Sequence, residues 1–185
     1  PFAGHPVLGT AAALLLLQKL PWQAPQTTVR LELGMGVVPV TVSGGELPER
    51  AQFSHRLISI PSSPISDQRL AWLPPALGLP MERFSQKVTA AAGELLLYPQ
   101  VVSGGALQLM VPVETPEDIE QIEASYRDVV VAERALGAEL GILAFSFITP
   151  PREGAPVQVR ARFFAYDAPQ EDPATGSAAA ALAVY

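Results

Sequence analysis

Two copies of one short motif stand near the two ends of the chain, and each begins with a titratable residue followed by proline. Residues 5–13 read HPVLGTAAA and residues 172–180 read DPATGSAAA, so five positions are identical and a sixth pairs threonine with serine. An Ala-rich helix often begins with proline, which would explain the proline and the alanines. It does not explain a glycine and a hydroxyl in the same register, so we interpret the motif as an internal duplication.

The chemistry of this motif follows from the helix that each copy is expected to begin at its proline. The first turn of a helix exposes unpaired N–H groups and the positive end of its dipole, which together bind carboxylate or phosphate. Gly4, Gly9 and Gly176 leave room for close approach of a ligand. If both helix starts face one cleft, His5 and Asp172 could move a proton beside a bound carboxylate.

Each candidate also has a structural interpretation. His5 could cap a helix and do nothing more, and Asp172 before a proline is a standard N-cap arrangement, although capping and catalysis are compatible. His55 has no comparable context and is interpreted as a strand residue. Ser177 is not in a Gly-x-Ser-x-Gly sequence, so it is not expected to be a nucleophile.

The elements that must position these residues alternate between strands and helices, which predicts an α+β protein. The first Ala-rich helix, residues 6–19, is apolar nearly all round, so we expect it to be buried on every side. The alanines of both Ala-rich helices would let a curved sheet pack closely against them. Expected strands cover residues 27–33, 36–42, 53–60, 101–102, 107–113, 142–149 and 157–166, and expected helices cover 6–19, 66–77, 115 onward, 128–138 and 173 onward.

Composition excludes several classes of protein. The 185 residues are 49% hydrophobic and 16% charged, which excludes disorder as the main state. A net charge of −6 without a basic cluster argues against nucleic-acid binding. With no cysteine and two histidines, no metal site and no cofactor are expected. The longest apolar run, residues 11–17, is too short to cross a membrane, so a cytoplasmic location is the default expectation.

The chain is expected to be an internal piece of a longer polypeptide, because it opens inside one motif and closes inside a helical pattern. Residues 60–64, IPSSP, are the best linker candidate. We therefore expect an incomplete N-terminal lobe at 1–61 and an incomplete C-terminal lobe at 62–185.

These motifs resemble the PhzF family of phenazine-biosynthesis-like isomerases. The resemblance rests on residues 1–11 (PFAGHPVLGTA), 171–178 (EDPATGSA) and 100–113, which follow the family's middle segment. It implies a diaminopimelate-epimerase-like fold of two similar lobes. In each lobe a curved, mostly antiparallel sheet wraps a central Ala-rich helix, the active site lies between the lobes, and the protein is a homodimer.

The resemblance also assigns roles. His5 and Asp172 would assist proton transfer, and Gly4, Gly176 and Ser177 would border a small carboxylate substrate. The two-cysteine chemistry of related epimerases is impossible in a chain without cysteine. The family's main acid/base is a glutamate upstream of the first motif, so residues 1–185 alone are expected to be inactive.

The leading hypothesis is a cofactor-independent isomerase or epimerase that moves a proton on a small carboxylic acid. The alternative is a non-catalytic protein that keeps the scaffold for carboxylate binding or for dimerisation.

Overall fold

The computed structural model describes residues 4–34, 36–54, 65–90, 93–103, 106–149, 155–165 and 171–185. The chain divides into two compact units, residues 1–56 and 57–185, and each is described by itself. The expected linker at 60–64 and His55 lie outside the described residues, as does most of the strand expected at 53–60. The predicted boundary between the lobes after residue 61 therefore stays a prediction.

The first unit packs helix α1 (Gly4–Leu16) on an antiparallel sheet of three strands. The strands are β1 (Gln26–Leu33), β2 (Gly36–Gly44) and β3 (Pro48–Gln52), paired in the order β1-β2-β3. The third strand precedes the predicted range because the chain reverses at Gly44. A Cβ atom there would lie 2.1 Å from the carbonyl oxygen of Leu47, so only glycine fits this tight turn.

Helix α1 buries one stripe rather than its whole surface. Val7, Ala11 and Leu15 follow one face and pack with the inward-pointing valines of the sheet. Leu16 is 51% exposed, so the expectation that this helix is buried on every side is wrong for the described residues. The physical reason is that the three described strands cover only one of its faces.

The second unit is built on a four-stranded sheet in the order β6-β7-β8-β9. The strands are β6 (Gln100–Ser103), β7 (Leu107–Pro112), β8 (Ile142–Phe147) and β9 (Val159–Phe164). β7 and β8 are parallel, and the other neighbours are antiparallel. The parallel pair is joined through α4 (Pro116–Glu120) and α5 (Tyr126–Leu136), as a parallel connection requires.

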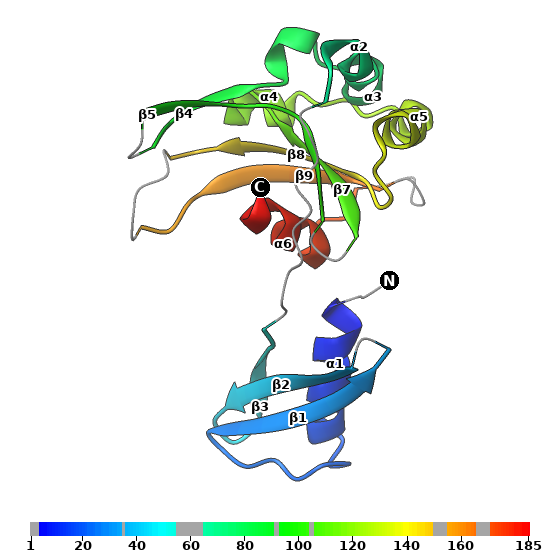
Figure 1. Ribbon diagram of the computed structural model, residues 1–185. Coiled ribbons are helices and arrows are strands. Elements are labelled where there is room, and N and C mark those ends of the chain that lie inside the picture. The colour runs from blue at the N-terminus through cyan, green and yellow to red at the C-terminus, as the bar shows by residue number, and fades with distance from the viewer. Residues whose placement is uncertain are drawn as a thin grey trace. The chain divides into compact units, whose positions relative to one another are not determined.

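Helices cover both faces of this sheet. On one face, Leu109, Val111 and Ile142 pack with residues of α3, α4 and α5, while on the other face Met110 and Phe145 pack with Ala178 and Ala181 of α6 (Gly176–Val184). Figure 1 shows α2 to α5 on one side of the strands and α6 on the other. These observations confirm the predicted α+β class, with mostly antiparallel sheets and a small-residue helix against each of the two larger sheets.

Two details of the second unit differ from the sequence prediction. The helix expected at 66–77 is two short helices, α2 (Asp67–Leu70) and α3 (Leu73–Leu77), because Pro74 and Pro75 lack the N–H groups that would continue α2. A hairpin of β4 (Gln86–Ala90) and β5 (Gly93–Leu97) was not predicted. The second of its strands reads GELLL, without alternation or β-branched residues.

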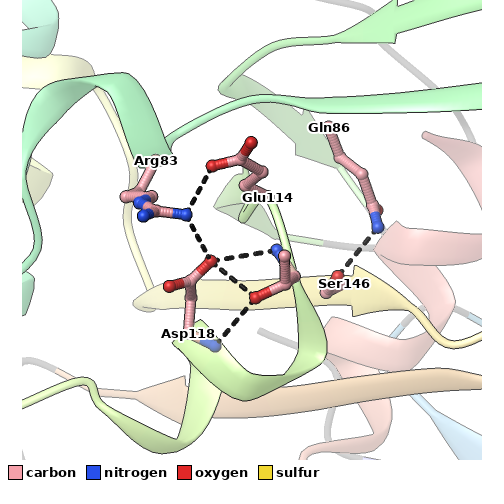
Figure 2. Close-up of polar contacts among 6 residues, drawn as sticks. Arg83, Gln86, Glu114, Asp118 and Ser146 are labelled. Carbon is pink, nitrogen blue, oxygen red and sulfur yellow. Dashed lines mark hydrogen bonds and ion pairs between the residues drawn. The ribbon is translucent and has the colours of Figure 1, made fainter.

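Polar contacts fix the start of α4 and the position of the hairpin (Figure 2). Thr115 and Asp118 form a reciprocal capping box, and Arg83, at the end of the short 3-10 helix Met81–Arg83, binds Glu114 over 2.6 Å and Asp118 over 3.4 Å. Gln86 reaches from β4 to β8, where it donates to the Ser146 hydroxyl over 2.8 Å. These contacts tie the outer layer of helices and the hairpin to the four-stranded sheet.

Candidate functional site

Asp172 is held by residues on both sides of it. Its backbone N–H donates to the carbonyl oxygen of Phe163 over 3.2 Å, which ties it to β9. Its carboxylate accepts hydrogen bonds from the Ala174 N–H over 3.1 Å and from the Thr175 hydroxyl over 2.6 Å. Such a turn closed by an aspartate side chain is a common device for fixing a carboxylate just before a helix.

The start of α6 differs from the prediction. The helix begins at Gly176 and Thr175 is its N-cap residue, so neither Asp172 as the cap nor Pro173 as the first helical residue is correct. The physical reason is the turn that Asp172 closes, because it keeps residues 172–175 out of the helix. The sequence does contain a signal for this turn, because an aspartate and a threonine three residues apart can form this side-chain hydrogen bond.

The two copies of the motif therefore begin their helices at different places. Helix α1 begins at Gly4, so His5 and Pro6 lie within its first turn. The position that corresponds to Thr175 is Leu8, which has no hydroxyl to close a similar turn. The sequence repeat does not give two equivalent helix ends.

A pocket of about 390 Å³ lies beside the start of α6. Asp172 and Gly176 line it, whereas Ser177, a predicted binding residue, is not among the residues of its wall. Apart from Asp172 and Thr175 the wall has no polar side chain, and the sequence analysis missed its apolar part. That part is formed by Leu143, Val159, Ala161, Phe163, Pro173, Ala174, Ala179 and Leu182.

An ion pair lies immediately beside the acid. Nε of Arg162 donates to both carboxylate oxygens of Glu171 over 3.0 Å each. Nη1 of the same side chain donates to the carbonyl oxygens of Ile119 and Ile122 over 2.9 Å each. The hydrogen bond to Glu171 raises the pKa of Arg162. Burial, and then the negative charge of Glu171, raise the pKa of Tyr126. Glu171 is thus a structural anchor.

The remaining predicted site residues lie in the first unit. His5 is exposed on the first turn of α1. A Cβ atom at Gly4 would lie 3.4 Å from Cζ of Phe53, so this glycine sits close to an aromatic ring. Within the described ranges, no three histidine or carboxylate side chains are grouped as a metal ion would need.

Residues 1–185 match the sequence model of the phenazine biosynthesis-like protein family, PhzC-PhzF. The chain belongs to this family. No curated protein matches the chain in sequence. None of the helices in the described ranges combines the length and the apolar character that crossing a bilayer requires.

Solved structures of the PhzF family and of epimerases share the fold. A PhzF-family phenazine biosynthesis protein from Bacillus anthracis is similar with a TM-score of 0.71 and 19% sequence identity. A predicted epimerase from Pseudomonas aeruginosa is similar with a TM-score of 0.68 and 25% sequence identity. Both alignments cover 100% of this chain and 56% of the other, so the chain spans little more than half of these relatives. A probable proline racemase from Agrobacterium radiobacter has a TM-score of 0.55 and 14% identity, with 99% of this chain and 52% of that chain covered.

Proposed function

We propose that the protein is a cofactor-independent isomerase or epimerase that moves a proton on a small carboxylic acid. Membership of the PhzF family and the likeness to epimerase structures support the reaction class. The observation that carries the proposal is the pocket beside α6, because one wall of it brings together a fixed carboxylate, Asp172, and the start of a helix at Gly176.

In this proposal the substrate carboxylate binds the first-turn N–H groups at Gly176 and Ser177. These groups point away from the helix body and carry the positive end of its dipole. As a proton leaves the neighbouring carbon, negative charge develops on the carboxylate, and fixed N–H donors stabilise that charge without reorganising. Gly4 would border the substrate in the other unit.

Asp172 and His5 are proposed as the two groups that carry the proton. The Thr175 hydroxyl and the Ala174 N–H fix the Asp172 carboxylate at the pocket wall, so the base would be oriented before substrate arrives. Both residues must act on one substrate molecule, and this requirement can be tested with variants.

The test is incorporation of solvent deuterium into candidate carboxylic acids by the complete gene product. Asp172→Asn and His5→Gln keep the size of each side chain and should each lower the exchange rate by about 10²–10⁴-fold. If the two residues serve one reaction, the double variant should lose little more than the worse single variant. Exchange that is unaffected by both substitutions would sink the proposed mechanism.

The alternative is a carboxylate-binding protein without catalysis. It predicts that small acids raise the melting temperature while none of them exchanges a proton with solvent. A homodimer and a cytoplasmic location also stay predictions, which analytical ultracentrifugation and cell fractionation would check.

A further inference from the structure

Glu171 and Asp172 lie beside the end of β9 and point to opposite faces of the sheet. Glu171 forms an antiparallel bridge with Phe164, and the Asp172 N–H donates to the carbonyl oxygen of Phe163 over 3.2 Å. Residues paired across antiparallel strands share a face, whereas neighbours along one strand point to opposite faces. Glu171 therefore shares the face of Phe164, which packs with α3, α4 and α5, and Asp172 lines the pocket on the face of α6.

Arg162 holds the Glu171 side chain on the face away from the pocket. Its Nε donates to both carboxylate oxygens over 3.0 Å each, and its guanidinium carbon lies 5.3 Å from the centre of the Phe164 ring. The same group donates to two carbonyl oxygens at the end of α4 and just after it. The side chains of Arg162 and Glu171 are 27% and 35% exposed, so water screens this ion pair only in part.

The other charged and titratable groups around Asp172 are few in the part of the second unit that the structure describes. The pocket wall from β8, β9 and α6 is apolar apart from Asp172 and Thr175. On the opposite face Tyr126 of α5 stays neutral where carboxylates titrate, because its pKa is raised from 10.0. The next ion pair along β9 joins Arg160 to an acid of α4. The charges that adjoin Asp172 in these ranges are therefore the opposite charges of one ion pair.

We infer that Arg162 is a positioning residue for the proton transfer, which acts on Asp172 through Glu171. The inference rests on the proposed function. By holding Glu171 on the opposite face, Arg162 keeps this segment on β9 with Asp172 directed to the pocket. It also balances the negative charge of Glu171, which would otherwise disfavour ionisation of the neighbouring acid. A general base must be oriented and ionised before it takes a proton, and the ion pair supports both conditions.

Removal of either partner of the ion pair should shift the titration of Asp172, and the two shifts should have opposite signs. Arg162→Met leaves the negative charge of Glu171 and should raise the midpoint by about 0.5–1 pH unit. Glu171→Gln leaves the positive charge of Arg162 and should lower the midpoint by a similar amount. The double variant lacks both charges and should titrate close to the wild type. A purely structural disturbance would move both single variants in the same direction.

The experiment is a carbon-13 NMR titration of the complete gene product, labelled at the aspartate carboxyl carbons and measured without added acid substrate. Asp172→Asn identifies the signal of Asp172. Arg160→Met, the control, removes an exposed ion pair on the same strand and should leave the midpoint unchanged. The inference is overturned if neither single variant shifts the midpoint, if both shift it in the same direction, if the double variant keeps a shift, or if Arg160→Met shifts it as far as Arg162→Met.

Glu171→Gln keeps the test decisive if Arg162→Met does not fold, which circular dichroism would show. A lowered midpoint in Glu171→Gln then supports the inference, and an unchanged or raised midpoint overturns it.

The exchange test of the proposed function links this titration to the reaction. The acid limb of the pH profile of deuterium exchange should move with the same sign as the titration in each variant. The acid concentration for half-maximal exchange should change less than about twofold, because the start of α6 and not Arg162 binds the substrate carboxylate. Exchange that Asp172→Asn abolishes, but whose pH profile is the same in the wild type and in Arg162→Met, overturns the inference alone. Opposite shifts in the titration without exchange into any candidate acid contradict the proposed function, and the role in proton transfer falls with it.

Discussion

The Thr175 hydroxyl donates to Oδ2 of Asp172 over 2.6 Å, so the N-cap residue of α6 is also the residue that orients the neighbouring acid. The hydroxyl therefore makes no side-chain cap bond to the helix. Its role is to hold the Asp172 carboxylate at the pocket wall. Substitutions of Thr175 can test this role separately from the stability of α6.

Thr175→Val keeps the shape of the side chain and removes this hydrogen bond. We expect the exchange rate to fall about tenfold or more, because a hydrogen bond to a charged group contributes about 1.5–3 kcal/mol. Thr175→Ser keeps the hydroxyl group and should exchange at nearly the wild-type rate. Solvent deuterium exchange measures the effect, and a matching loss of rate in Thr175→Ser would show that the methyl group matters instead.

Arg162 and Arg160 stand two residues apart on β9 and form ion pairs of different burial. Arg162→Met removes the partner of Glu171 and of two carbonyl groups, and should lower the free energy of unfolding by about 2–3 kcal/mol. Arg160→Met, the control, removes an exposed ion pair with Glu120 and should change the free energy of unfolding by at most about 1 kcal/mol. Urea unfolding checks both values, and equal losses would contradict the anchoring role of Arg162.

Gly141 and Gly93 both have positive φ angles, +144° and +120°, but their surroundings differ. A Cβ atom at Gly141 would lie 2.5 Å from Cζ of Phe163 and 2.6 Å from the Phe164 carbonyl oxygen, whereas at Gly93 it would meet open space among the described residues.

Gly93→Ala should therefore cost only backbone strain, about 1–2 kcal/mol. Gly141→Ala adds a clash with backbone and should cost about 3 kcal/mol or more, and it should also displace the Phe163 ring from the pocket wall. Thermal unfolding of the two variants tests the difference. A similar loss in both would show that the strand ends adjust freely around Phe163.

Tyr185 makes the free energy of unfolding depend on pH in the alkaline range. Burial raises its pKa from 10.0 to about 12, and its hydroxyl donates to the Tyr98 carbonyl over 2.6 Å. The unfolded chain loses this proton first, so the stabilisation is complete below about pH 10 and is lost as the pH rises toward about 12. Unfolding free energies measured across this range should fall more steeply for the wild type than for Tyr185→Phe, in which Tyr126 still keeps its raised pKa.

The sequence could predict those parts of the molecule that depend on local pattern. Apolar and β-branched runs, with alternation at 27–33, predicted most strands of both larger sheets, and Thr115 followed by proline predicted the start of α4. The start of α6 was misplaced because a side-chain turn at Asp172 overrides the preference of proline for a first helical position. The role of Arg162 could not be predicted, because its partners come from residues 119, 122 and 171, and only the fold brings them together.

Arg162 has a consequence for how this protein can evolve. Its side chain lies on the α4 side of the sheet, where it binds the carbonyl groups of Ile119 and Ile122, and it also holds the residue that precedes Asp172. The end of α4 with the residues just after it, and Glu171 beside the acid, therefore bind one guanidinium group. We therefore expect substitutions that move residues 119–122 to shift Arg162 and Glu171 and so to disturb the position of Asp172, although none of these residues lines the pocket.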